Sequence, residues 1–280
     1  MARAPRRLAF GLATVLGLKK RGFFIPYRYA DRIPERRARS SYEALELVFR
    51  AAEPSFQGVL EAINACADAF RSIGQDPPPQ PRWNQDWFPR LDAAAAYVFV
   101  RAGEPHRIIE VGSGHSTRFM ARAVRDAGIH TEILAIDPQP RADIADTGAI
   151  LRKETAQQAG VAAFAPLSSG DVLFIDSSHI LMPGTDVDLL FNHVLPALPA
   201  GVMVHVHDVF LPDDYPPDWE WRSYNEQLGV AALIQSRGYR LLWSSHYAAT
   251  RMADAVAASA AGALELVPGA HESSLWMVKT

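Results

Sequence analysis

Short apolar runs alternate with helical patterns through the second half of the chain. Two strand-and-helix pairs come first, Arg107–Val111 with Thr117–Asp126, and Glu132–Ile136 with a helix expected near Arg141–Leu151. A weak strand is expected within Arg152–Ala156. Two more strand-and-helix pairs follow, Val172–Ile175 with Val187–Leu195, and Val202–His207 with Asn225–Arg237. The last two expected strands are Tyr239–Ser244 and Leu275–Lys279. Such alternation is typical of a parallel sheet covered by helices. We therefore expect an α/β fold with a doubly wound, seven-stranded, mostly parallel sheet whose last strand inserts antiparallel.

The residues before this region have a different pattern. Between Ser40 and Ile73, apolar residues recur at steps of three and four, which predicts helices, and Pro54 marks the start of one of them. The segment Gln75–Pro81 is rich in proline and is expected to form a stiff linker. The pattern predicts a helical extension over residues 1–81 and a second domain over residues 82–280.

The basic residues gather at the N-terminus. Residues 1–50 hold 12 Lys and Arg against 4 Asp and Glu, although the net charge of the whole chain is −3. An apolar run, Leu8–Leu18, lies between basic residues and is too short to span a bilayer. Charges follow the run where a signal peptide would have a cleavage site. We expect a short amphipathic helix that either packs on the protein or makes peripheral contact with an anionic membrane through residues 1–25.

The composition limits the kinds of site and partner that the chain can have. Cys66 is the single cysteine, which excludes internal disulfides and cysteine-rich zinc sites. The near-neutral charge gives no signal for a nucleic-acid partner. We expect a cytoplasmic protein; the oligomeric state is not predicted.

A strand, a glycine turn and a helix form the first chemical motif. The strand ends in Gly112-Ser113-Gly114, and a second apolar strand ends at Asp137. Glycine lets the backbone approach a ligand, and a carboxylate after the next strand can bind ribose hydroxyls. The motif therefore predicts a site for an adenosine-containing cofactor. Its expected binding residues are Glu110, Gly112, Ser113, Gly114, Ser116 and Asp137.

The same motif distinguishes two kinds of cofactor. Dinucleotide sites prefer a third glycine where this chain has Thr117, and Glu110 would repel a pyrophosphate. A carboxylate at that position can attract the cationic amino-acid end of S-adenosylmethionine (SAM). The pattern E-x-G-x-G followed by a strand ending in an acid resembles the first two motifs of class I SAM-dependent methyltransferases. A nicotinamide-dependent oxidoreductase is correspondingly disfavoured.

A second group of polar residues follows the fourth and fifth strands. Asp176 and His179 come after Val172–Ile175, and the next strand ends in His205-Val206-His207-Asp208. The carboxyl ends of parallel strands share the edge where α/β enzymes bind ligands. We expect Asp176, His207 and Asp208 to converge there as possible ligands of a cation, and His205 to be a core histidine.

These segments carry a more specific resemblance. Phe174-Ile175-Asp176-Ser177-Ser178-His179, the Leu195-Pro196…Pro199-x-Gly201 turn and His205-x-His207-Asp208-Val209-Phe210 resemble a bacterial family of SAM-dependent methyltransferases. This broad group is related to macrolide and other natural-product sugar O-methyltransferases, and the likeness covers Trp83 to Lys279. It implies a Rossmann-like methyltransferase fold.

The resemblance also implies roles for single residues. Asp176 and Asp208 would hold a magnesium ion that anchors the acceptor hydroxyl, and His179 would act as the catalytic base. His207 stands where the family has an acid, and imidazole is a weaker ligand for magnesium. The expected metal residues are therefore Asp176, His207 and Asp208, with Mg²⁺, another divalent metal or no metal bound.

The sequence thus predicts SAM-dependent O-methylation of a small hydroxylated acceptor such as a sugar or natural product. The alternatives are N-methylation of a small molecule and a non-catalytic SAM-binding domain at a membrane surface. Aromatic residues near the expected site are open to two interpretations, contact with ligand or packing against the core. They are Trp83 and Trp87 with the neighbouring Asn84, and Tyr215, Trp219 and Trp221.

Overall fold

The computed structural model describes residues 3–35 and 39–280, apart from the side chains of residues 3–6. It divides into two compact units, Met1–Arg39 and Ser40–Thr280. The sequence placed the boundary at residues 81 and 82 instead. Phe49, Phe56 and Phe70 explain the difference, because these helical side chains are buried in the core of the larger unit.

The smaller unit contains helix α1 (Arg3–Val15) and the 3₁₀ turn η1 (Ala30–Arg32). The amphipathic helix expected at Leu8–Leu18 is present but begins and ends earlier, and the expected contact segment includes residues 1 and 2, which lie outside the described part. Leu8, Leu12 and Leu16 are each more than half exposed. In the described ranges, no helix combines the length and apolarity that crossing a bilayer requires. Membrane contact by this segment stays a prediction.

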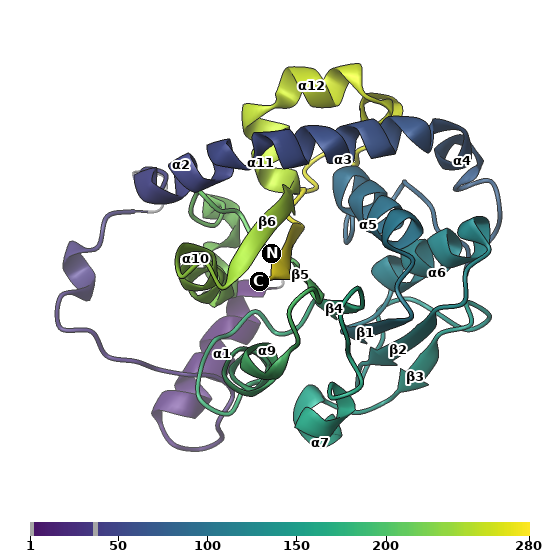
Figure 1. Cartoon of the computed structure of the whole chain (residues 1–280). Coiled ribbons are helices and arrows are strands. Elements are labelled where there is room, and N and C mark those ends of the chain that lie inside the picture. Colours follow the sequence, from purple (N-terminus) through teal and green to yellow (C-terminus); the bar gives the residue numbers. More distant parts are fainter. Residues whose placement is uncertain (1–2, 36–38) are drawn as a thin grey trace. The chain divides into compact units, whose positions relative to one another are not determined.

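The larger unit is built on a seven-stranded sheet (Figure 1). The strand order is β3-β2-β1-β4-β5-β7-β6, and β7 is antiparallel to both of its neighbours. This topology confirms the predicted α/β fold with a reversed last strand. The bounds are β1 (Arg107–Val111), β2 (Glu132–Ile136), β3 (Ile150–Arg152), β4 (Val172–Ile175), β5 (Met203–Val206), β6 (Tyr239–Ser244) and β7 (Leu275–Lys279).

Helices cover both sides of this sheet. In Figure 1, α5 and α6 lie on one side of the sheet and α9 and α10 on the other. The helices of the larger unit are α2 (Glu43–Ala51), α3 (Glu53–Ala65), α4 (Ala67–Ser72), α5 (Arg90–Gly103), α6 (His115–Ala127), α7 (Ala156–Ala159), α8 (Asp186–Leu189), α9 (Leu195–Ala197), α10 (Glu226–Gln235), α11 (Ser245–Arg251) and α12 (Ala253–Ala258). Shorter turns are η3 (Val161–Ala163), the π-helical η4 (Leu190–Val194), η5 (Pro217–Arg222) and η6 (Ala260–Ala263). Pro54 lies in the first turn of α3, as predicted.

Two predicted helices differ from the structure. No helix forms at Arg141–Leu151, where Asp146 and Gly148 have positive φ angles of 62° and 84° that a right-handed helix cannot contain. The helix expected at Val187–Leu195 is instead α8, η4 and α9 in succession. Thr185 caps its start, because its side chain accepts a hydrogen bond from the Asp188 amide.

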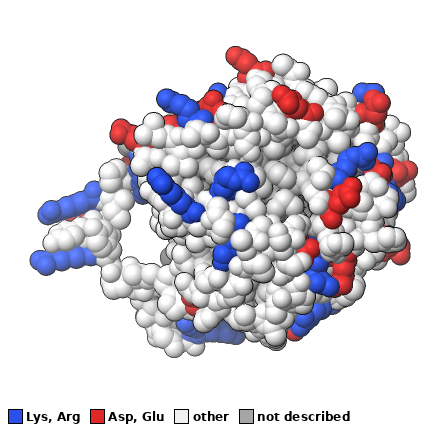
Figure 2. Space-filling view, viewed as in Figure 1, with Lys and Arg blue, Asp and Glu red and all other residues white. Residues whose placement is uncertain are grey.

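The core of the sheet explains why the strand predictions hold. All four residues of β4 are fully buried, and β1 is buried from Ile108 onward. A strand covered on both faces needs a continuous apolar run, which is what the sequence shows. On the face shown in Figure 2, Lys and Arg side chains are interspersed with Asp and Glu.

Candidate active site

The carboxyl ends of β1, β4 and β5 bring the predicted site residues to one edge of the sheet. The amide of Asp176 donates a 2.9 Å hydrogen bond to the carbonyl of Val111, at the end of β1. The amide of His207 donates a bond of the same length to the carbonyl of Ile175, at the end of β4. The glycine turn, Asp176 and His207 therefore lie side by side.

The glycine turn packs directly on the end of β4. Gly112 has a φ of +86°, and a Cβ added to it would lie 2.0 Å from the carbonyl oxygen of Asp176. Glycine is thus required here for both conformation and space. Gly114 has a φ of +155° and precedes the first residue of α6.

Glu110 holds this turn from beneath. Its carboxylate is completely buried and accepts hydrogen bonds from the hydroxyls of Ser116 and Thr117. Thr117 in turn accepts a 3.0 Å bond from the amide of Gly114. Burial raises the pKa of Glu110 to about 8, against the opposing effect of the two hydroxyls. Ser116 and Glu110 face one another, so their direct contact with a cofactor stays a prediction.

A cavity of about 740 Å³ opens beside the turn and is large enough for a nucleoside ligand. Gly112, Ser113 and Asp137, three of the expected cofactor-binding residues, line it, and their binding of a cofactor stays a prediction. The Asp137 carboxylate accepts hydrogen bonds from the amides of Ser113 (2.8 Å) and Gln139 (2.7 Å), which fixes it at the cavity wall. The Ser177 hydroxyl, also in the lining, is buried without a hydrogen-bond partner among the described residues. This donor set fits an adenosine-containing ligand.

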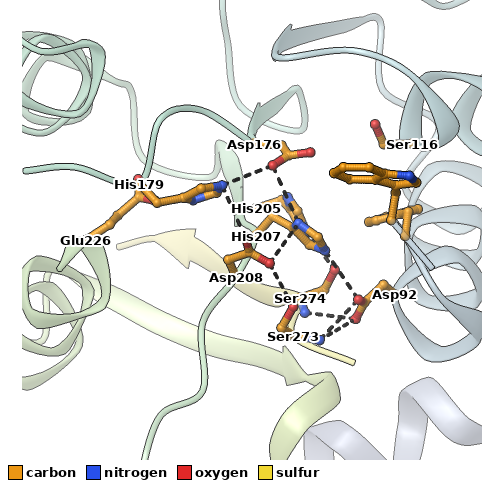
Figure 3. Close-up of polar contacts among 12 residues, drawn as sticks. Asp92, Ser116, Asp176, His179, His205, His207, Asp208, Glu226, Ser273 and Ser274 are labelled. Atoms are coloured by element: carbon orange, nitrogen blue, oxygen red, sulfur yellow. Dashed lines mark hydrogen bonds and ion pairs between the residues drawn. The ribbon is translucent and has the colours of Figure 1, made fainter. Parts of the chain in front are cut away.

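Four side chains converge above β4 and β5 (Figure 3). The Nε2 atom of His179 lies 3.3 Å from carboxylate oxygens of both Asp176 and Asp208. The Nδ1 atom of His207 lies 3.5 Å and 3.4 Å from oxygens of the same two residues. The structure therefore brings together all four residues that the sequence selected, as two carboxylates between two imidazoles.

Each imidazole also has a buried carboxylate on its other nitrogen. The Nδ1 atom of His179 is 2.9 Å from Glu226, the first residue of α10. The Nε2 atom of His207 is 3.3 Å from Asp92 of α5. Glu226 and Asp92 are 1% and 0% exposed, although nothing in their sequence surroundings indicates a site. Sequence reasoning missed both, because acidic residues in helices usually face solvent.

The two supporting carboxylates differ in their own partners. Asp92 accepts hydrogen bonds from the amides of Ser273 and Ser274, so its oxygens are held by backbone donors. One oxygen of Glu226, in contrast, is buried without a partner among the described residues. Burial raises the pKa of Glu226, with partial opposition from His179. Glu226 can therefore take up a proton, whereas Asp92 is fixed as an acceptor.

Charge coupling dominates this cluster. Burial favours a neutral imidazole, yet Asp208, Asp176 and Glu226 together hold the pKa of His179 well above its usual value. The pKa of His207 is likewise well above its usual value, because Asp208 and Asp176 outweigh the effect of burial. The pKa of Asp176 lies well below its usual range, since His207 and His179 outweigh burial there. The imidazolium and carboxylate forms stabilise one another.

The backbone is strained at two residues of this cluster. His179 and Asp208 adopt positive φ angles of 60° and 57°, which cost free energy for residues other than glycine. The carbonyl of His179 accepts hydrogen bonds from the amides of Asn225 (3.2 Å) and Glu226 (3.3 Å). The start of α10 therefore positions both His179 and its supporting carboxylate.

The cluster does not fit the expected magnesium ion. Magnesium prefers oxygen ligands in octahedral geometry, whereas imidazole nitrogens here pair with the two carboxylates. Over residues 3–35 and 39–280, no three or more His, Cys, Asp or Glu side chains are arranged to hold a metal ion. The arrangement thus gives no support to metal binding by Asp176, His207 and Asp208. His205 is a core residue as expected: it is fully buried, stacks on Phe174 and lies 2.8 Å from the Ser274 hydroxyl.

A smaller cavity of about 110 Å³ adjoins the first, and Asp176 and Arg141 line both. His207 and Asp208 also face it, whereas His179 lies behind the carboxylates and is 3% exposed. For four of the aromatic residues, the structure now distinguishes contact with a ligand from packing against the core. Trp87 and Trp219 line this cavity, while Trp83 and Tyr215 are buried packing residues.

Comparison with known proteins adds the enzyme class. Residues 109–209, which span the glycine turn and the histidine cluster, match the family model described as a methyltransferase domain. This part of the chain is a methyltransferase domain, which confirms the enzyme class that the glycine motif predicted. The narrower resemblance to natural-product sugar O-methyltransferases stays a prediction.

Solved structures similar to the chain include three methyltransferases. A methyltransferase from Podospora anserina, PaMTH1, is 17% identical, with 92% of this chain and 99% of that chain covered and a TM-score of 0.44. An O-methyltransferase from Bacillus cereus is 14% identical over 80% and 91% of the two chains, with a TM-score of 0.42. TomG from Streptomyces achromogenes is 13% identical over 79% and 89%, with a TM-score of 0.41. No curated protein matches the chain.

Proposed function

We propose that this methyltransferase transfers the methyl group of SAM to a hydroxyl of a small acceptor. The observation that carries the proposal is the junction of the two cavities at Asp176, with the His179–Glu226 pair directly behind it. A ligand in the larger cavity and one in the smaller cavity meet at that residue. The bound cofactor supplies an electrophilic methyl group on a sulfonium; the protein aligns the acceptor and removes a proton.

The residues of the larger cavity suit the cofactor. The backbone at Gly112 permits close approach, and Asp137 presents a fixed carboxylate for ribose hydroxyls. Glu110 lies under the glycine turn with its carboxyl oxygens bonded to hydroxyl groups of the protein, so its role in cofactor binding is a supporting one. It acts by holding the turn through its hydrogen bonds to Ser116 and Thr117.

The residues at the junction suit removal of a hydroxyl proton. We infer that the acceptor hydroxyl donates to Asp176 and that its proton passes to His179, whose Nε2 lies 3.3 Å from that carboxylate. Because the pKa of His179 is raised, the imidazole must first lose its own proton to solvent, so turnover should rise with pH. Glu226 can share this proton because one of its oxygens lacks a partner among the described residues. His207 is fixed by Asp92 and keeps Asp176 and Asp208 in place.

Proton removal by Asp176 and His179 needs no metal ion. The Asp176 carboxylate is paired with imidazole nitrogens of His179 and His207 instead. Enzyme treated with EDTA and then gel-filtered is therefore expected to keep its turnover, and added Mg²⁺ or Mn²⁺ to leave it unchanged. Loss of turnover on chelation, with recovery on adding either ion, would contradict the assignment.

The proposed function is tested in two stages. SAM and S-adenosylhomocysteine (SAH), but not NAD, should raise the melting temperature by several degrees, because a ligand of the folded state stabilises it. A panel of sugars, catechols and amines is then incubated with SAM and analysed by mass spectrometry for a mass gain of one methylene. Methylation of hydroxylated acceptors supports the proposal. Stabilisation by NAD, or products formed from the amines alone, would refute it.

A further inference from the structure

The smaller cavity contains a guanidinium group that the proposed reaction does not use. Arg222 ends η5 and lines this cavity together with Arg141 and three carboxylates. Asp176 and Asp208 are each neutralised by imidazoles at 3.3–3.5 Å. The remaining carboxylate of the lining is Asp86. Among the described residues Arg222 forms no ion pair with an acidic side chain, and its Nη1 bonds to the hydroxyl of Tyr224 instead.

Aromatic rings hold Arg222 in place. Its guanidinium carbon lies 4.0 Å from the ring centre of Trp219 and 5.3 Å from that of Tyr224. Its Nη1 donates a 2.9 Å hydrogen bond to the Tyr224 hydroxyl, and its Nε is buried without a partner among the described residues. Stacking leaves the edge of a guanidinium free for a bidentate contact with an oxyanion. The group is thus fixed in position and short of acceptors.

The position of Arg222 relative to the reacting group is also defined. The Tyr224 ring that contacts Arg222 also contacts the His179 imidazole, with 4.6 Å between ring centres. Arg222 and His179 are therefore one tyrosine ring apart. A molecule that presents its hydroxyl to Asp176 can reach Arg222 with a group on its opposite end, because both residues line the cavity.

We propose that Arg222 binds an anionic group of the methyl acceptor, a carboxylate or a phosphate, so that the substrate is a cyclic hydroxy acid or sugar phosphate. This rests on the proposed function and specifies its substrate class. A neutral polyol could accept a hydrogen bond from the guanidinium but would leave its positive charge without a counterion, whereas an oxyanion would supply both. Trp87 and Trp219, which flank the cavity, suit a ring-shaped acceptor.

The test compares acceptors that differ only in charge. The first pair is 3,4-dihydroxybenzoate and 3,4-dihydroxybenzamide; the second set is galacturonate, galactose 6-phosphate and galactose. We expect the wild type to prefer an anionic member by at least about tenfold in kcat/KM, the size of a charge-assisted contact. Preference for galacturonate or for the sugar phosphate tells carboxylate from phosphate. In Arg222→Gln this ratio should fall to about threefold or less.

Arg240→Gln serves as the matched control, because Arg240 is an exposed residue of β6 outside both cavities. The control should keep the wild-type ratio. An acid-to-neutral ratio near one in the wild type, or a ratio that Arg222→Gln leaves unchanged, would overturn the proposal. Methylation of neutral acceptors alone would overturn it while leaving the methyl-transfer function intact.

A binding measurement covers acceptors that are not turned over. The SAH-loaded protein is titrated calorimetrically with 3,4-dihydroxybenzoate and with galactose 6-phosphate. Binding of an anionic probe that weakens at least about tenfold in Arg222→Gln supports the proposal. Absence of binding by both probes, or equal binding to the wild type and the variant, overturns it. Failure to bind SAH would instead count against the proposed function.

Discussion

Replacing Gly112 by alanine tests the close packing of the glycine turn against β4. Two separate costs are expected. The φ of +86° is unfavourable for an L residue by about 1–2 kcal/mol. The new Cβ would also stand 2.0 Å from the Asp176 carbonyl oxygen, a backbone atom that cannot rotate away. Such overpacking typically costs a further 1–3 kcal/mol or so.

Gly148→Ala separates the two costs. Gly148 has nearly the same φ, +84°, but an added Cβ there meets nothing within 4 Å. This control should lose only the conformational part, about 1–2 kcal/mol in the free energy of unfolding. The excess loss in Gly112→Ala, about 1–3 kcal/mol, therefore measures the steric conflict with Asp176.

The measurements are urea unfolding, thermal melting and calorimetric titration with SAH. For a domain of this size, each kcal/mol lowers the melting temperature by about 2–4 °C. Displacement of the turn by about an ångström would also lower turnover on the order of 100-fold in Gly112→Ala. Gly148→Ala should bind SAH as the wild type does. Equal stability losses in the two variants, with unchanged SAH affinity and turnover in Gly112→Ala, would refute the packing argument.

Three other expected outcomes concern the histidine pair and the N-terminal segment. His179→Ala should lower kcat by about 10²–10⁴-fold in steady-state assays, while its dissociation constant for SAH stays within about twofold of the wild type. A variant that kept the kcat of the wild type would exclude His179 as the proton acceptor. Glu226 helps to raise the pKa of His179, so Glu226→Gln should lower that pKa and leave the imidazole neutral at lower pH. The acidic limb of the pH profile of kcat/KM should then move to lower pH; a limb that stays or moves upward would contradict this pairing. The full chain should sediment with anionic phosphatidylserine vesicles, and a chain lacking residues 1–39 should not; equal behaviour of the two would end the membrane hypothesis.

The strands show what local pattern could predict. The bounds of β1, β2, β4, β6 and β7 agree with the sequence, because each is a buried or half-buried apolar run with polar or turn residues at its ends. The residues after β4 and β5 could be selected for the same reason, since the ends of parallel strands meet at one edge. The helix predicted at Arg141–Leu151 was wrong. Asp146 and Gly148 in this segment have positive φ angles, so the chain forms turns there instead of a helix.

By itself, the sequence determined the sheet, the glycine turn and the four residues of the histidine and carboxylate cluster. The tertiary structure decided what surrounds that cluster. Asp92 lies 115 positions before His207 in the chain, and Glu226 lies 47 positions after His179. An acidic residue in a helix has the same local pattern whether it faces solvent or a buried imidazole. Only the tertiary structure, which brings α5 to His207 and α10 to His179, removes water from these carboxylates, and this converts ordinary helical acids into partners of the histidines.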